Sequence, residues 1–200
     1  MWSSHLWLGL GWIAYGGLHS ILASSVCKDW FEKQLKGYFR YYRLFYIIFA
    51  SISLIILLYW LWITPSFRFW NPGILSKISG ILITITGIII MAICIRKYLH
   101  SLQIIKTPGT EDPDQVLYQQ GLHSYIRHPL YLGTFLFIWG TFLIIPYASL
   151  FVSYLIITVY TLVGIRYEEK KLVKVFGGNY IRYMQQVPMI LPRLKKRAQL

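Results

Sequence analysis

The stretch that decides the fold runs from Pro129 to Ile165 and reads PLYLGTFLFIWGTFLIIPYASLFVSYLIITVYTLVGI, without one charged residue. A bilayer core needs about 20 helical residues, so at about 1.5 Å of rise per residue this stretch is too long for one span. Pro146 lies near its middle. Because proline removes a helix hydrogen bond and clashes with the preceding turn, the stretch predicts two shorter helices, at about 129–145 and 147–165, joined by a tight turn.

The whole chain has the composition of a membrane protein. Hydrophobic residues make up 56%, charged residues only 14%, and the mean hydropathy is +0.51. A soluble domain carries about a quarter charged residues, so a soluble enzyme, a disordered tail and a secreted disulfide scaffold are disfavoured. Three further uncharged runs, at 1–27, 44–63 and 78–95, predict spans at about 4–26, 44–63 and 76–95.

The predicted fold class is therefore all-α. We expect one polytopic membrane domain over residues 1–200, with five transmembrane helices of which the fourth and fifth form a helical hairpin. Residues 166–200 are expected to form a cytoplasmic, amphipathic helical tail.

The distribution of basic residues predicts an orientation for these spans. The formal net charge is +13. Of the 20 Lys and Arg, all but Arg68 and Lys77 fall on one side of the five-span arrangement. The positive-inside rule then places the N-terminus outside and the C-terminus in the cytoplasm. The basic excess, including the run at 193–197, is expected to contact anionic lipid headgroups rather than nucleic acid.

The sequence gives little sign of metal or transport chemistry. His123 and His128 are five residues apart, which is not the i,i+4 spacing of a helical zinc pair, and no metal site is expected. Apart from histidines, no predicted span interior contains an ionisable acid or base. Pumps and transporters typically place such groups there, so a transporter is disfavoured.

Polar residues concentrate first at the entrance to the fourth span, where residues 121–133 read GLHSYIRHPLYLG. Pro129 suits the first turn of a helix, and Arg127 and His128 then lie beside its partial positive end. Two interpretations are open. Either the arginine extends to headgroups and the histidine lies at the interface, or these groups form a pocket for a polar or anionic ligand.

The second polar segment follows the fifth span. Glu168 and Glu169 lie near the membrane surface, and Gly177-Gly178 is a helix stop. Tyr180 and Tyr183 share one face of a following short helix at i,i+3. A tail helix bound to anionic lipid is one interpretation. The carboxylate of Glu168 does not suit that surface and needs a cation: Arg127, Lys171 or a ligand ammonium.

Both segments resemble the isoprenylcysteine carboxyl methyltransferase-like superfamily of integral-membrane methyltransferases. Its pattern is a glycine, RHPxYxG at a span start, a helical hairpin, then EExxLxxxFGxxYxxY and a proline. The chain matches with Gly121, with residues 127–133, with residues 168–183 and with Pro188. A weaker likeness, at residues 19–24 and 42–46, is to the nurim and methanethiol S-methyltransferase branch.

This resemblance implies S-adenosylmethionine as the methyl donor, with S-adenosylhomocysteine as the product. Glu168 would hold its α-ammonium, and Arg127 would meet its carboxylate or pair with Glu168. The implied cofactor-binding residues are Gly121, His128, Pro129, Tyr131, Gly133, Glu168, Glu169, Tyr180 and Tyr183. The tail at 166–200 would thus complete the cofactor site. The implied catalytic residues are Arg127, Arg43 and His19, which would favour an acceptor thiolate by positive charge or by accepting a proton. A structural role for His19 as an interhelical hydrogen-bonding residue is also open.

The function expected from the resemblance is membrane methyl transfer to a lipophilic or small hydrophobic acceptor. A thiol, a prenylcysteine carboxylate and a lipid amine all qualify. The alternative is a non-catalytic structural or binding protein that retains the methyltransferase-like fold.

Overall fold

The computed structural model describes residues 2–102 and 117–192 of the chain. These residues are predominantly helical, and the one β-feature among them is an isolated antiparallel bridge between Arg68 and Tyr147. The predicted all-α class is therefore confirmed. The basic run at 193–197, predicted to contact lipid, lies outside the described residues.

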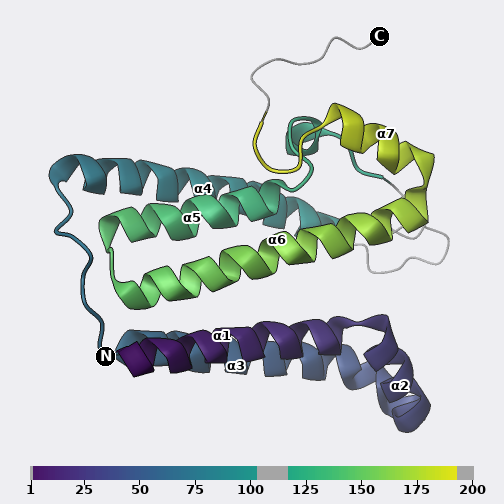
Figure 1. Ribbon diagram of the computed structural model, residues 1–200. Coiled ribbons are helices and arrows are strands. Elements are labelled where there is room, and N and C mark those ends of the chain that lie inside the picture. The colour runs from purple at the N-terminus through teal and green to yellow at the C-terminus, as the bar shows by residue number, and fades with distance from the viewer. Residues whose placement is uncertain (1, 103–116, 193–200) are drawn as a thin grey trace. The chain divides into compact units, whose positions relative to one another are not determined.

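Most helix ends in the structure lie within a few residues of the predicted span ends (Figure 1). In chain order they are α1 (Trp2–Ala23), α2 (Ser25–Leu35), η1 (Lys36–Tyr41), α3 (Tyr42–Ile63), α4 (Ile74–Leu102), η3 (Gly121–Ser124), α5 (Pro129–Ile144), α6 (Ala148–Phe176) and α7 (Gly178–Gln186). The predicted break at Pro146 is confirmed, since α5 ends at Ile144 and α6 begins at Ala148. Helix α6 continues unbroken to Phe176, beyond the span predicted to end at about 165, and where the span itself ends stays a prediction. Helix α2 was not predicted.

Four helical segments are long and apolar enough to cross a membrane: Trp2–Ala23, Ser25–Ile63, Ile74–Arg96 and Ala148–Phe176. The fifth predicted span corresponds to α5, a shorter apolar helix of 16 residues. At about 1.5 Å of rise per residue this helix is about 24 Å long. The count of five spans therefore stays a prediction.

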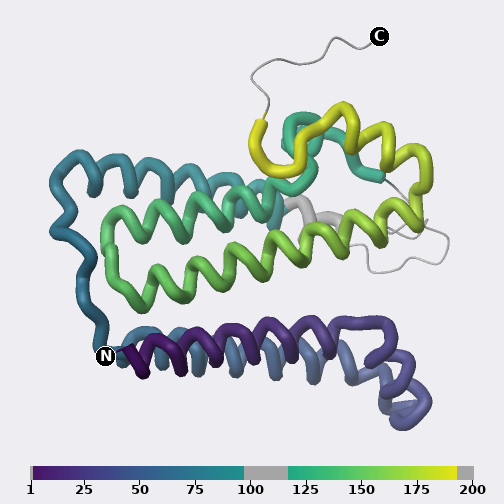
Figure 2. Tube along the Cα trace, viewed as in Figure 1, coloured from purple at the N-terminus to yellow at the C-terminus, as the bar shows by residue number. Residues whose placement is uncertain are grey.

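The chain divides into two compact units, and α6 contributes residues to both. The first unit comprises residues 1–71 and 146–160. Its core contains Leu8, Trp12 and Leu57, so it packs α1 against α3, as the Cα trace in Figure 2 shows. The loop after α3 pairs with the start of α6, where the Phe69 N–H donates to the Pro146 carbonyl over 2.9 Å.

The second unit, residues 72–145 and 161–200, is built on close packing of α4 and α5. Two glycines seven residues apart on α4, Gly80 and Gly87, face two glycines seven residues apart on α5, Gly140 and Gly133. A Cβ at Gly87 would lie 2.6 Å from the Gly133 carbonyl oxygen, and one at Gly140 would lie 2.7 Å from the Thr84 nitrogen. Small residues let membrane helices approach this closely, and the same approach fixes the position of the start of α5.

We predict that Gly87→Ala lowers the unfolding temperature of the purified protein in detergent, because its methyl group meets α5 backbone that cannot move aside cheaply. Overpacking of this kind costs about 1–3 kcal/mol. Gly17→Ala on α1 is the matched control, since a Cβ there meets no atom within 4 Å. Equal unfolding temperatures for the two variants would contradict the packing described for α4 and α5.

Candidate functional site

The candidate site lies in the second unit, where the start of α5 meets the end of α6 and the segment after α7. We call the side chains of Arg127, His128, Tyr131, Glu168 and Glu169 the carboxylate site. The chain reaches this arrangement through a turn at Gly177, whose φ of +55° suits glycine. That turn ends α6 and starts α7, as predicted for the Gly177-Gly178 pair.

Arg127 connects the start of α5 with α6 and with the segment that follows α7. Its Nε donates to Glu169 Oε1 over 2.7 Å, and its Nη1 donates to the carbonyls of Met184 and Val187. Its backbone N–H donates to the Pro188 carbonyl over 2.9 Å. The side chains of Arg127 and Glu169 are only 8% and 10% exposed. A buried charge requires such compensation, so this ion pair and these carbonyls hold the segment after α7 against the start of α5.

Glu169 also binds the neighbouring histidine. His128 Nε2 lies 3.1 Å from the same Oε1 that accepts from Arg127, and the His128 N–H donates to the Met189 carbonyl over 3.1 Å. When Nε2 carries the proton and donates to Glu169, the neutral imidazole leaves Nδ1 as an acceptor. Glu169 is thus matched by two donors on the buried side of the site.

Glu168 is in a different position. Its side chain is 44% exposed, its Oε2 accepts from the Tyr131 hydroxyl over 3.1 Å, and His128 Nδ1 lies 3.9 Å away. Arg127 pairs with Glu169 rather than with Glu168, and its contact with the carboxylate of a donor stays a prediction. The carboxylate site contains two carboxylates and one guanidinium, and the guanidinium pairs with Glu169. The remaining negative charge is at Glu168, which suits a cationic ligand group.

Tyr180 and Tyr183 belong to the core beneath this site. Both are buried, and they pack with Val187 against Leu172 and Phe176. The Tyr183 hydroxyl donates to the His123 carbonyl over 2.6 Å. Burial raises the pKa of Tyr183 to about 12, so the phenol stays protonated and keeps donating at neutral pH. Its contribution to stability is complete below about pH 10, the usual phenol pKa, and is lost as pH rises toward 12.

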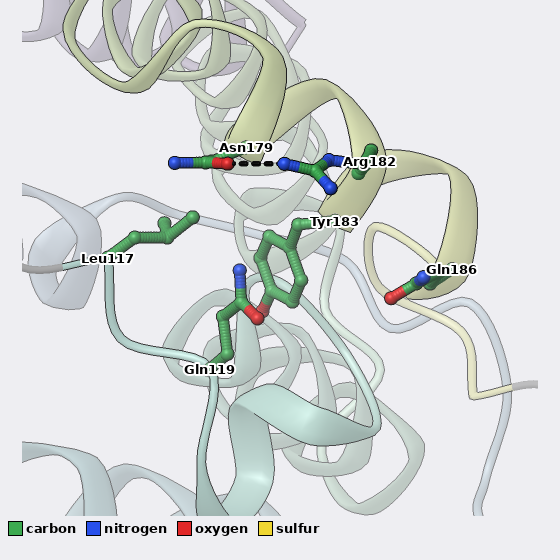
Figure 3. A pocket seen from close by; sticks show the side chains of 6 residues that line it. All are labelled: Leu117, Gln119, Asn179, Arg182, Tyr183 and Gln186. Atoms are coloured by element: carbon green, nitrogen blue, oxygen red, sulfur yellow. Dashed lines mark hydrogen bonds between the residues drawn. The ribbon is translucent and has the colours of Figure 1, made fainter. Parts of the chain in front are cut away.

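A cavity of about 400 Å³ is lined in part by Tyr183 (Figure 3). It is lined by Leu117, Gln119, Asn179, Arg182, Tyr183 and Gln186. Arg182 Nη2 donates to Asn179 Oδ1 over 2.7 Å at its rim, as the dashed line in Figure 3 marks. Tyr183 is the one predicted site residue among the residues that line this cavity.

The remaining predicted cofactor residues have clear structural roles as well. Pro129 occupies the first turn of α5, as predicted. Gly121 has a φ of +64° and begins η3. Gly133 faces α4, where a Cβ would lie 2.8 Å from the side chain of Met91. Close helix packing alone therefore explains a glycine at position 133, and its contact with a cofactor stays a prediction.

Two of the predicted catalytic residues, His19 and Arg43, belong to the first unit. Arg43 is exposed at the start of α3. His19 lies beside Tyr46, whose hydroxyl is 2.9 Å from Nε2 and 3.2 Å from Nδ1. Tyr46 belongs to the weaker motif at residues 42–46, which implied no role for it. Nothing in the spacing of residues on separate helices indicates which tyrosine contacts a given histidine.

Within the described residues, 2–102 and 117–192, no group of three or more His, Cys, Asp or Glu side chains is arranged to bind a metal ion.

Comparison with known proteins gives consistent matches. The family model for phospholipid methyltransferases matches residues 75–179. A methanethiol S-methyltransferase of Crocosphaera subtropica is 29% identical over 90% of this chain and 71% of its own length. Methanethiol S-methyltransferase 2 of Bradyrhizobium diazoefficiens is 30% identical over 88% of this chain and 68% of its own length.

A third relative, from another branch, covers less of the chain. The protein-S-isoprenylcysteine O-methyltransferase of Saccharomyces cerevisiae is 31% identical over 64% of this chain and 55% of its own length. No solved structure matches the chain. These relatives confirm the resemblance predicted from the two motifs.

The two neighbouring glutamates are predicted to differ in their effect on stability. Glu169→Gln leaves the buried guanidinium of Arg127 without its counter-charge, and breaking a buried pair in this way costs about 3–5 kcal/mol. Glu168→Gln removes a half-exposed charge and should change the unfolding temperature little. Thermal unfolding in detergent, without ligand, compares the two. A larger loss for Glu168→Gln would contradict the assignment of Glu169 as the structural carboxylate.

Proposed function

Because the chain belongs to the phospholipid methyltransferase family and is therefore a membrane methyltransferase, we propose that its methyl donor is S-adenosylmethionine and its acceptor a small hydrophobic thiol. The observation that carries the choice of donor is the half-exposed, incompletely compensated carboxylate of Glu168 beside the buried Arg127–Glu169 pair. The thiol is favoured by the methanethiol S-methyltransferases, which align over most of the chain.

The residues of the carboxylate site fit such a donor. Glu168 would bind the α-ammonium, because a carboxylate with one phenol donor and a distant imidazole has acceptor capacity left. His128, Pro129 and Tyr131 would line the adenosine and methionine part of the pocket, and tyrosine rings suit a sulfonium through cation–π attraction. When bound, S-adenosylmethionine supplies an already activated methyl group.

Within this proposal, the other predicted site residues hold the donor-binding residues of the preceding paragraph in position. Glu169 and Arg127 hold His128 and the segment after α7 in place through their buried contacts. Tyr180 and Tyr183 provide the packed base of the site, and Gly121 the turn that leads into it. Since the donor is already activated, the protein contributes orientation and exclusion of water more than acid–base help.

We predict that Glu168→Gln weakens binding of S-adenosylhomocysteine at least about tenfold, since a hydrogen bond to a charged group is worth about 1.5–3 kcal/mol. Titration calorimetry of the detergent-purified protein measures the change. Glu32→Gln, an exposed glutamate on α2, is the matched control and should bind like the wild type. Unchanged affinity of Glu168→Gln would refute the ammonium site. Absence of binding by the wild type would favour the non-catalytic alternative.

We also propose that α1, α3, α4, α5 and α6 each cross the membrane, with the N-terminus outside and the carboxylate site on the cytoplasmic side. The basic residues support this orientation, because Arg68 and Lys77 alone among the 20 Lys and Arg fall on the proposed outer side. Anionic headgroups would then contact the cytoplasmic face.

This topology predicts which positions an impermeant reagent reaches from outside the cell. With Cys27 and Cys94 replaced by alanine, a single cysteine at Asn71, in the loop between α3 and α4, should react with a membrane-impermeant maleimide in intact cells. A cysteine at Glu32 should react only after the membrane is opened. The reverse labelling pattern would contradict the proposed orientation.

A further inference from the structure

Helix α2 belongs to the first unit and has no part in the carboxylate site. Helix α1 ends at Ala23, and the Ser24 side chain then caps α2 by accepting from the Cys27 N–H over 3.2 Å. Such a cap satisfies an N–H group that the first turn of a helix leaves unpaired. The chain therefore ends its first proposed span and at once begins a separate helix, which turns away from the line of α1 (Figure 1).

The length and composition of α2 suit neither a span nor a buried helix. Its 11 residues correspond to a length of about 16 Å, whereas a bilayer core requires about 20 helical residues. The sequence SVCKDWFEKQL mixes acidic and basic residues with aromatic ones, and none of these 11 residues, all of them described, is buried. Through η1, the helix nevertheless leads from α1 directly into α3, and both of those helices are proposed to cross the membrane.

The inward face of α2 is set by Tyr42, the first residue of α3. The Tyr42 hydroxyl donates to the Leu22 carbonyl over 2.7 Å and lies 3.7 Å from Cys27 Sγ. The Phe31 ring lies 5.0 Å from the Tyr42 ring, between centroids. Cys27 and Phe31 are four residues apart and therefore share one stripe of α2. This inward stripe packs against the start of α3 and fixes the rotation of α2 about its axis.

A second apolar stripe of α2 consists of Val26 and Trp30. These two residues are also four apart, and they are 78% and 57% exposed. At about 100° per residue, their stripe lies directly beside the inward stripe of Cys27 and Phe31. About half of the circumference of α2 is therefore apolar, and the outer of its two apolar stripes is exposed.

The other half of α2 carries its charges. Lys28 and Glu32 form one stripe, and Asp29 and Lys33 form the other. By the same rotation of about 100° per residue, these two stripes lie opposite the two apolar ones. A helix with one apolar half, one charged half and low overall hydrophobicity is typical of helices that lie in the plane of the membrane interface.

The 3₁₀ helix η1 continues this pattern toward α3. Tyr38 and Tyr41 are 73% and 50% exposed. The Arg40 guanidinium lies over the Tyr41 ring, 4.7 Å from its centroid. Tyrosine and tryptophan are enriched where acyl chains meet headgroups, because their rings are apolar and their O–H or N–H groups are polar. The exposed aromatic residues of α2 and η1 therefore have the chemistry of a headgroup layer.

We propose that α2 and η1 lie in the headgroup layer of the bilayer, with Val26 and Trp30 turned toward the acyl chains and Lys28 and Glu32 turned toward water. The partner of the exposed apolar stripe is thus lipid. The chain enters α2 from one proposed span and leaves η1 into another, which holds the segment at the membrane surface. The exposed Arg40 and the lysines of α2 offer cations to lipid phosphates there.

Only the first unit is involved in this contact. The proposed spans of α1 and α3 are required, whereas the identity of the methyl donor is not. Either orientation of the chain is compatible, because headgroups border both surfaces of a bilayer. The competing interpretation is that the stripe of Val26 and Trp30 packs against protein, such as a second copy of the chain.

Spin labels measure on which side of α2 the lipid lies. Cys27 and Cys94 are replaced by alanine, and the protein is reconstituted into vesicles of phosphatidylcholine and phosphatidylglycerol. Four substitutions then provide one nitroxide site each: Val26→Cys, Trp30→Cys, Lys28→Cys and Glu32→Cys. We expect labels at 26 and 30 to collide more often with oxygen, which concentrates in lipid, and several-fold less often with a water-soluble nickel chelate than labels at 28 and 32.

Two results would overturn the proposal. One is an equal frequency of chelate collisions at all four positions. The other is a pair of labels at 26 and 30 that are immobilised by contact with protein. Ile52→Cys, near the middle of α3 and 54% exposed, is the control and should meet oxygen but not the chelate. A label there that meets the chelate would refute the proposed span of α3, so that failure is distinguished from failure of the α2 contact alone.

A second readout uses the protein with both cysteines in place. Phosphatidylcholine with a nitroxide on its headgroup quenches tryptophans that lie at that depth. With Trp30 in the headgroup layer, Trp30→Phe should lower the fraction of tryptophan emission that this lipid removes. An unchanged or larger quenched fraction would mean that Trp30 lies away from the headgroups, and would overturn the proposal.

Discussion

The buried ion pair between Arg127 and Glu169 is the interaction on which the rest of the second unit depends. It joins a residue just before α5 to one near the end of α6, and the same guanidinium binds carbonyls that follow along α7. A guanidinium and a carboxylate taken out of water are tolerated only when each is fully matched. The segment at 184–189 must therefore lie where its carbonyls accept from Arg127. This position also places the Met189 carbonyl against the His128 N–H.

The difference between the two adjacent glutamates follows from helix geometry. Successive residues on an α-helix point about 100° apart, at 3.6 residues per turn. When Glu169 faces Arg127 and His128, Glu168 must therefore point to a different side. There it meets the Tyr131 hydroxyl and is half exposed. One acid neutralises the buried arginine, and the other stays half exposed, which suits the proposed contact with a ligand cation. A single acid at this position could not face both sides.

Hydrophobicity and breaker residues predicted most of the fold. The uncharged runs and Pro146 located the long apolar helices, and Gly177 marked the end of α6 because a positive φ suits glycine. The continuation of α6 from 165 to Phe176 was not predicted, since charged residues mark a membrane boundary but do not end a helix. The α4–α5 contact was missed although Gly80 and Gly87 repeat the spacing of Gly133 and Gly140. Equal spacing alone does not say which faces meet.

The sequence predicted which residues gather at the candidate site, but not which of them form pairs. The motifs brought Arg127, His128 and both glutamates together, as the structure does. They left open which carboxylate the arginine binds, because that depends on the rotation of α6 about its axis. The contacts of His19 with Tyr46 were out of reach for a similar reason, since they join helices far apart in the sequence.

The central claim is that Glu168 binds the α-ammonium of the donor, and a thermodynamic cycle tests it most directly. S-adenosylhomocysteine and its analogue without the α-amino group are titrated calorimetrically against the wild type and Glu168→Gln. The coupling between the two deletions isolates their interaction. We predict that loss of the amino group weakens binding to the wild type at least about tenfold, in line with a charge-assisted hydrogen bond, and changes binding to Glu168→Gln little. An equal loss with both proteins would contradict the account.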